Sequence, residues 1–372
     1  MKFTLAVTAF VGLIGRCSDM DIDPPWHGHH PPPPAADDDA GVDDETCGPE
    51  GLYVDRYCKR LARGVIPYTP RYELWADGAD KQRFIFLPEG EQIDTSNPDR
   101  WNFPKNTRLY KTFSLDGKKL ETRVFTKLEE APGIASWDYR AFAWNKDQRT
   151  VRPALETGEK DVLDTDHDIP SRDECKSCHD QTRRRPEATD IINGFEAIQL
   201  NHDGRGWTLE RLIEQDRLVN LSGDRPNVTL DNTRVPGRRA EQAALGYMHA
   251  NCGNCHVGVT PAQGLNLSLV IGATRQPATA LAYEEVCEPL ARWTGKENSV
   301  GEDYLHAIVP GSAATSGIVG RMIAEDLENR MPRIGREYRD PVGIETVSQW
   351  IEDLDPEDCP PPPPPPPPAP TP

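Results

Sequence analysis

Residues 240–256 read AEQAALGYMHANCGNCH, and they end in two cysteines and a histidine at C-x-x-C-H spacing. The run from 240 to 250 predicts a helix that leads directly into Cys252-Gly253-Asn254-Cys255-His256. The same spacing occurs upstream, at Cys175-Lys176-Ser177-Cys178-His179. One chance match in such a chain is expected about half a per cent of the time, so two by chance are negligible.

The C-x-x-C-H spacing is the attachment signal for a c-type haem. Two thiols add to the haem vinyl groups, and the adjacent imidazole falls beneath the iron as the proximal ligand. We therefore expect two covalently bound haems c. The residues expected to hold them are Cys175, Cys178, His179, Cys252, Cys255 and His256, with both histidines as iron ligands.

Two other kinds of site use paired cysteines. A zinc site needs four ligands, which two C-x-x-C pairs can supply. A thioredoxin-like dithiol needs one pair and no histidine. The histidine that follows both pairs, together with the signs of export at the N-terminus, favours haem over both alternatives.

The ligand on the far side of each iron is expected to be a methionine or a second histidine. Met331-Pro332 follows the second motif and precedes the last predicted helix, as the methionine loop of class I cytochromes c does, so we assign Met331 to the second haem. For the first haem, Met248, His249 and His202 all remain candidates. An iron with no sixth protein ligand is the other possibility.

The chain has nine cysteines, of which four lie in the two motifs. We expect Cys17 to be lipidated, which leaves Cys47, Cys58, Cys287 and Cys359. Four exported cysteines can pair in three ways. The simplest pairing joins Cys47 to Cys58 and Cys287 to Cys359.

The first residues predict export. Lys2 precedes an apolar stretch from 3 to 14 that is too short to span a bilayer. Cys17 follows, as in the signal whose cysteine becomes the lipidated first residue, although Arg16 stands where that signal has a small residue. Residues 1–17 therefore predict a signal peptide and a periplasmic or cell-envelope lipoprotein that touches the membrane only through its lipid.

Composition marks both ends as non-globular. Residues 18–50 contain ten carboxylates and no lysine or arginine and predict an acidic, Pro-rich tether. Residues 359–372 predict a polyproline tail. The net charge of −18 argues against nucleic acid as a partner. It is compatible with a basic redox partner, and equally with ordinary solubility.

Residues 51–165 predict β structure. Residues 107–115 and 118–128 flank Asp116-Gly117, a strong hairpin signal, and a further strand pair is predicted at 137–144 and 150–155. Eleven aromatic residues predict the core of a β-sandwich-like domain. They are Tyr68, Tyr72, Trp75, Phe84, Phe86, Trp101, Phe103, Phe113, Phe125, Trp137 and Trp144.

From residue 166 the pattern changes to helices. Residues 208–221, with Thr208 as a cap, and residues 345–354 carry apolar side chains at helical spacing. Residues 166–235 would hold the first haem, and residues 236–358 would form a class I cytochrome c-like second haem domain. The predicted fold class is α+β multidomain, with a β-sandwich-like N-terminal domain followed by two mainly α cytochrome c-like haem domains.

Several stretches resemble an uncharacterised family of bacterial exported dihaem c-type cytochromes. In the first half they are Tyr72-Glu73-Leu74-Trp75, Asp77-Gly78-Ala79-Asp80-Lys81, Trp101-Asn102-Phe103-Pro104, Lys111-Thr112-Phe113 and Glu121-Thr122-Arg123. In the second half they are the motif at 252–256, Pro310-Gly311-Ser312, Arg321-Met322, Met331-Pro332 and Trp350-Ile351. Some members are joined to quinoprotein sugar dehydrogenase-like propellers. The resemblance thus implies an electron acceptor for a quinoprotein dehydrogenase.

We therefore expect an electron-transfer protein of the cell envelope with redox proteins as partners. A dihaem peroxidase-like oxidoreductase, in which one haem keeps an open site, is the alternative enzyme class. A third hypothesis makes residues 51–165 a binding module for a substrate or polysaccharide.

Overall fold

The computed structural model describes residues 46–179 (without the side chains of 176–178), 189–190, 192–223, 227–257, 265–271, 278–287, 303–333, 335 and 337–358. Contacts divide the chain into Met1–His30 and Pro31–Pro372, and every described residue belongs to the second unit. The predicted signal peptide, Cys17, almost all of the tether, Cys359 and the polyproline tail lie outside the described residues.

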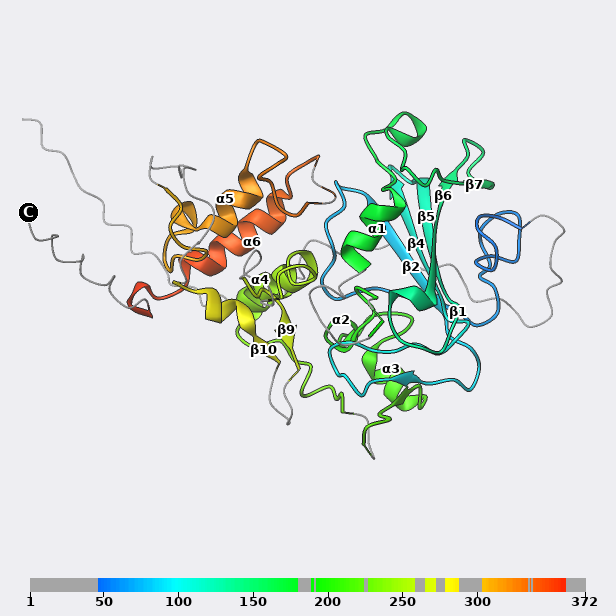
Figure 1. Cartoon of the computed structure of the whole chain (residues 1–372), viewed down its shortest axis with the longest axis horizontal. Helices are drawn as coiled ribbons and strands as arrows, with labels where there is room; N and C mark the ends of the chain where they lie inside the picture. Colours follow the sequence, from blue (N-terminus) through cyan, green and yellow to red (C-terminus); the bar gives the residue numbers. More distant parts are fainter. Residues whose placement is uncertain are drawn as a thin grey trace, which may run out of the picture. The chain divides into compact units, whose positions relative to one another are not determined.

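The largest element is a six-stranded antiparallel sheet with the strand order β1-β2-β4-β5-β6-β7 (Figure 1). Its strands are β1 (Val65–Tyr68), β2 (Asp80–Phe86), β4 (Arg108–Leu115), β5 (Lys118–Lys127), β6 (Trp137–Trp144) and β7 (Val151–Pro153). Two short pairs lie outside it: β3 (Ile93–Asp94) with β8 (Leu218–Val219), and β9 (Leu269–Val270) with β10 (Thr279–Ala280).

The predicted hairpin is confirmed, because β4 and β5 pair across Asp116-Gly117. The two turn residues have φ values of 49° and 75°. Positive φ at both positions defines the two-residue turn whose twist matches that of the strands, and Gly117 adopts it without steric cost. The strand predicted at 137–144 is β6, and β7 lies within 150–155.

The two faces of the sheet pack on different partners, because successive side chains of a strand point to opposite sides. One face carries Phe84, Tyr110 and Val124 and packs on the loop at 47–61. The opposite face carries hydrophobic residues such as Ile85 and packs on loops and short helices between 101 and 212. In the described part, the sheet is therefore covered by loops and helices and not by a second large sheet.

The α-helices are α1 (Arg172–His179), α2 (Ala197–Leu200), α3 (Leu209–Glu214), α4 (Arg239–Asn251), α5 (Gly317–Ile323) and α6 (Pro341–Glu352). Short 3-10 turns are η1 (Ile134–Ser136), η2 (Val162–Asp164), η3 (Leu281–Glu285), η4 (Ala313–Thr315) and η5 (Pro356–Asp358). Helix α6 packs on α4 and α5 (Figure 1).

The helix predictions have mixed outcomes. Helix α4 covers the predicted 240–250, and α6 overlaps the predicted 345–354 but begins earlier, where the Asp340 carboxylate accepts the Val342 N–H at 3.1 Å. Thr208 caps α3 as predicted. The helix predicted at 208–221 is wrong beyond Glu214, because residues 218–219 pair with β3 instead.

Two further observations concern the cysteines and the membrane. Cys47 and Cys58, paired in the sequence analysis, form a disulfide. Cys287 is also disulfide-bonded, and its predicted partner, Cys359, lies outside the described residues. No helix in the described part of the chain is long and apolar enough to cross a bilayer.

Candidate functional site

The first motif lies on α1, which begins with a reciprocal cap. The Ser171 hydroxyl accepts the Glu174 N–H at 3.2 Å, and the Glu174 carboxylate accepts the Ser171 N–H at 2.8 Å. This satisfies donors that the first turn of a helix leaves unpaired. Cys175 and His179 are four residues apart and therefore share one face of the helix.

The second motif continues from the C-terminal end of α4. The backbone N–H groups of Cys255 and His256 donate to the Cys252 carbonyl at 3.0 and 2.8 Å. The bond from His256 spans four residues, so His256 follows Cys252 by one helical turn of the backbone. A side chain at Gly253 would place Cβ 2.9 Å from the Ser268 Cα and 3.0 Å from two carbonyl oxygens, so only glycine fits there.

Both motifs line one cavity of about 1390 Å³. Its described wall includes Cys175, His179, Cys252, Cys255, His256 and Met331. Pockets for a drug-sized ligand ordinarily measure about 300–1,000 Å³. The cavity is open to solvent on one side and is large enough for a large ligand or for more than one.

One polar atom in the wall supports this interpretation. Asn193 lines the cavity, and its buried side-chain oxygen has no hydrogen-bond partner among the described residues. Buried polar groups almost always have a partner, so an orphaned acceptor facing a cavity is typical of a ligand site.

Burial shifts the pKa of two motif cysteines. Burial, and then the neighbouring Cys255, raises the pKa of Cys252 to about 12. Burial also raises the pKa of Cys175, against the lowering effect of Arg123. Both side chains are therefore neutral at physiological pH. Among the described residues, no group of three or more His, Cys, Asp or Glu side chains is placed to hold a metal ion.

Aromatic side chains of the sheet flank the first motif. The His179 ring lies 4.7 Å from the Phe125 ring and 5.8 Å from the Tyr139 ring, measured between centroids. Five of the predicted core aromatics line the cavity, and Phe125 among them also packs against the core on that face of the sheet. The five are Tyr68, Tyr72, Trp75, Phe113 and Phe125.

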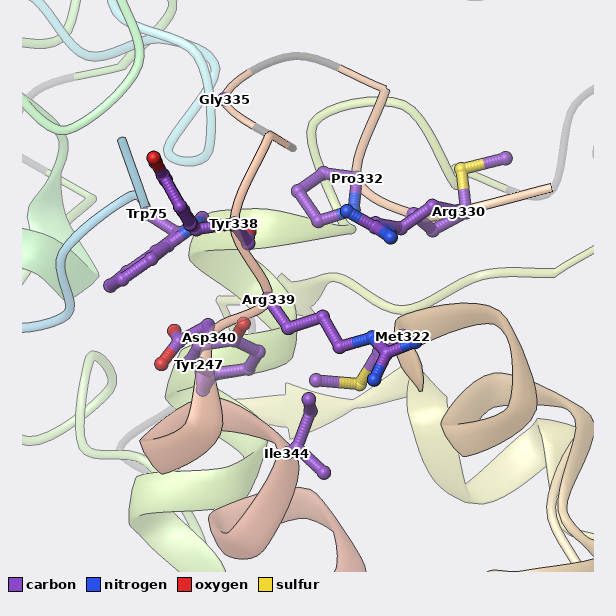
Figure 2. Close-up of a pocket in the computed structure, with 11 residues that line it drawn as sticks. Trp75, Tyr247, Met322, Arg330, Pro332, Gly335, Tyr338, Arg339, Asp340 and Ile344 are labelled. Carbon is purple, nitrogen blue, oxygen red and sulfur yellow. The ribbon is translucent and has the colours of Figure 1, made fainter. Parts of the chain in front are cut away.

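Met331 lines the cavity, as a ligand of the second iron would, and its N–H donates to the Arg321 carbonyl at 2.9 Å. Met322 lines the cavity too. Both methionines also border a small adjoining pocket, where Met322 lies beside Ile344 (Figure 2). Both thioethers are therefore placed at the cavity, and Met331 remains the assignment made from the sequence.

The three candidates for the first iron have other surroundings, and none of them belongs to the described cavity wall. His202 accepts the Gly204 N–H through Nδ1 at 2.8 Å, and its Nε2 lies 2.7 Å from the Thr69 carbonyl. Met248 is fully buried within α4.

His249 likewise uses both ring nitrogens within the protein. Its Nδ1 accepts the Leu269 N–H at 3.0 Å, and its Nε2 lies 2.7 Å from a Glu196 carboxylate oxygen. Neither His202 nor His249 can bind iron without breaking these hydrogen bonds.

The sequence analysis missed a connection between the two halves of the site. The Trp75 N–H donates to the Asn251 side-chain oxygen at 2.7 Å, and the Asn251 side-chain nitrogen donates to the Glu73 carbonyl at 3.0 Å. The chain just before β2 is thus fixed to the end of α4, next to the second motif. No local pattern in the sequence predicts this pairing, because the residues are far apart in the chain.

Comparison with known proteins adds no assignment, because no family model, no curated protein and no solved structure matches this chain.

Proposed function

We propose that this protein is a dihaem c-type cytochrome that passes single electrons between partners in the cell envelope. The observation that carries the proposal is that both C-x-x-C-H motifs, which are far apart in the sequence, line the same cavity. Two haems attached there would be neighbours, as transfer of electrons between them requires.

The residues present fit such a cofactor. Cys175 with His179, and Cys252 and Cys255 with His256, offer the thiols and imidazoles that covalent attachment and proximal ligation need. The cavity volume and the orphaned Asn193 oxygen are consistent with a large polar-edged ligand. When bound, the haems would supply the one-electron chemistry.

The protein's own side chains would set the conditions. Thioether bonds from the cysteines would fix the position of each macrocycle, and Phe125 and Tyr139 would exclude water on the side of His179. Met331 would act as the sixth ligand of the second iron, and a methionine ligand raises the potential. The partners we propose are redox proteins, with a quinoprotein dehydrogenase as the class of electron donor. We also propose that a lipid at Cys17 anchors the protein to the membrane.

A second function is favoured by one observation. None of the three candidates for the first iron belongs to the described cavity wall, and both histidines among them have their ring nitrogens engaged. An iron left open on one side would suit a dihaem peroxidase-like oxidoreductase. The electron-carrier proposal stands first because the sequence around neither motif shows a dihaem peroxidase pattern.

The test is the optical spectrum of the matured, reduced protein with and without carbon monoxide. If neither haem binds it, both irons have six ligands, as the electron-carrier proposal expects. If one haem shifts completely, an open iron exists, and peroxide turnover becomes the next assay.

A further inference from the structure

Three cationic side chains form a row across three adjacent strands. Arg83 on β2 lies directly opposite Lys111 on β4, and Lys111 lies directly opposite Arg123 on β5. Directly opposed residues project from the same face of a sheet. All three side chains line the cavity. We call these three residues the cationic row.

Such a row is unfavourable by itself. Neighbouring strands lie about 4.8 Å apart, and like charges directly opposite one another destabilise a sheet. Burying the charges adds a desolvation cost unless each has a partner. Three like charges on directly opposed positions conflict with the usual pairing preferences of a sheet. Such conflicts are expected at functional sites.

Nearby carboxylates offset only part of the charge. Glu73 pairs with Lys81 at 3.3 Å and with Arg83 at 3.4 Å, and the Glu121 carboxylate pairs with Arg123 at 2.5 Å. In the described part of the chain, Glu73 and Glu121 are the carboxylates whose ion pairs with the cationic row and Lys81 are established by distance.

Lys111 is the member of the row with no anionic partner in contact. Among the described residues, its ammonium has no ion pair or hydrogen bond and lies 4.8 Å from the centroid of the Phe113 ring. Burial, followed by Arg83, Arg123 and Lys81, lowers its pKa well below the ordinary value, and Glu73 acts in the opposite sense. An anion in the cavity would remove this penalty.

We propose that the cationic row binds a carboxylate group within the cavity. This deepens the proposed function and rests on it, because the carboxylate we expect is a propionate of the haem attached through Cys175 and Cys178. A soluble carboxylate that enters the cavity is the other source of the same chemistry.

The row belongs to the first motif for a structural reason. Arg123 and Phe125 are two residues apart on β5 and therefore project from the same face. Phe125 contacts the His179 ring, and Arg123 acts on the pKa of Cys175. The Arg123 end of the row is therefore the end nearer to the first motif, and the row extends from β5 toward β2. The propionates lie on the opposite edge of a haem from its thioether bonds.

The experiment compares Lys111→Met with Lys118→Met in the matured full-length protein. Lys118 is exposed and begins β5 in the same hairpin. Each variant replaces one lysine by methionine, so Lys118→Met is the control for a lysine outside the row. Haem content is measured first, and both reduction potentials are then titrated with and without sodium acetate at constant ionic strength. Lys111→Gln replaces Lys111→Met if the latter does not mature.

If a propionate occupies the row, Lys111→Met makes one haem about tenfold harder to reduce, or about 59 mV lower in potential. Loss of the cation favours the oxidised, more positive iron, and acetate has no effect on the wild type. If a soluble carboxylate occupies it, acetate shifts one wild-type potential saturably and has no effect on Lys111→Met.

The inference is overturned if Lys111→Met behaves like Lys118→Met and acetate changes neither potential, with two haems present throughout. A wild type without haem overturns the proposed function instead. In that case the effect of acetate on thermal unfolding tests the cationic row. If the row binds carboxylates, acetate raises the thermal midpoint of the wild type but not that of Lys111→Met. If the row does not bind them, acetate raises neither midpoint.

Discussion

Lys127 and Asp190 form an ion pair with 2.6 Å between Nζ and Oδ1, and both side chains are fully buried. Lys127 ends β5, and Asp190 follows the first C-x-x-C-H motif in the chain, so the pair fixes the chain at Asp190 to the large sheet. The same carboxylate accepts the Phe103 N–H and the Gly133 N–H, both at 2.9 Å. Its charge is therefore well compensated.

Breaking this pair should destabilise the protein strongly, because the buried Asp190 carboxylate would lose the cation with which it pairs. We expect Lys127→Met to lower the free energy of unfolding by about 3–5 kcal/mol, measured by urea titration. Lys105→Met removes an exposed lysine whose pair with Glu129 is open to solvent, and should cost at most about 1 kcal/mol. Equal effects of the two substitutions would contradict the structural role assigned to Lys127.

The buried Glu121 carboxylate should make the stability of the fold sensitive to acid. Burial alone would raise its pKa, yet the Arg123 guanidinium and the His167 imidazole lower it below the ordinary value. A carboxyl of this kind contributes stability that is complete above its unfolded pKa of about 4.3. That stability is lost as the pH falls through the lower folded value.

Glu121→Gln should therefore be less stable than the wild type at pH 7, by about 3–5 kcal/mol. The difference should shrink as the pH falls below about 4, since the wild-type carboxyl then becomes protonated as well. Urea unfolding at several pH values measures this, with the exposed Glu129→Gln as the control. A difference that stays constant from pH 7 to pH 3 would refute the ionic role of Glu121.

The Cys47–Cys58 disulfide closes a short loop, with a sequence separation of 11 residues. Replacing both cysteines by serine should lower the free energy of unfolding by about 2–3 kcal/mol, because the unfolded chain regains conformational freedom. Reductant should then have a smaller effect on this variant than on the wild type. No change in chemical unfolding on replacing both residues would show that the bond does not stabilise the N-terminal loop.

The optical spectra and reduction potentials of two variants can show whether Met331 or Met322 is the iron ligand. Met331→Ala should open the second iron to carbon monoxide and lower its potential, since a methionine ligand raises the potential. Met322→Leu should keep both properties, since Met322 would serve only for packing. The reverse result, with carbon monoxide binding only in the Met322 variant, would transfer the ligand role to Met322.

Local patterns predicted the elements that depend on local chemistry. Asp116-Gly117 places the turn of the hairpin, and Thr208 caps a helix, because these residue types favour those conformations wherever they occur. Residues 218–219 were mispredicted because tertiary pairing with β3 overrides helical spacing. Helix propensity is a weak prior against such pairing.

The cationic row was beyond sequence reasoning for a specific reason. Counting back from a two-residue turn places Lys111 opposite Thr122, but an irregularity between Phe113 and Ser114 shifts the register by one residue. Lys111 consequently faces Arg123. A shift of one residue in the register exchanges the two faces of a strand, and the residue types at 113 and 114 do not predict such a shift.

The candidate site divides in the same way. The two motifs were identified from spacing alone, because covalent chemistry fixes that spacing. That both motifs face one cavity depends on long-range contacts, such as the bond from Trp75 to Asn251, which no local pattern encodes.

The most direct test of the central claim is the number of covalently bound haems in the matured protein. Intact mass and the pyridine haemochrome spectrum should give two haems per chain in the wild type. One haem should remain in Cys175→Ala/Cys178→Ala and one in Cys252→Ala/Cys255→Ala. A fully matured wild type with no covalent haem, or with a haem count that either double substitution leaves unchanged, would contradict the account.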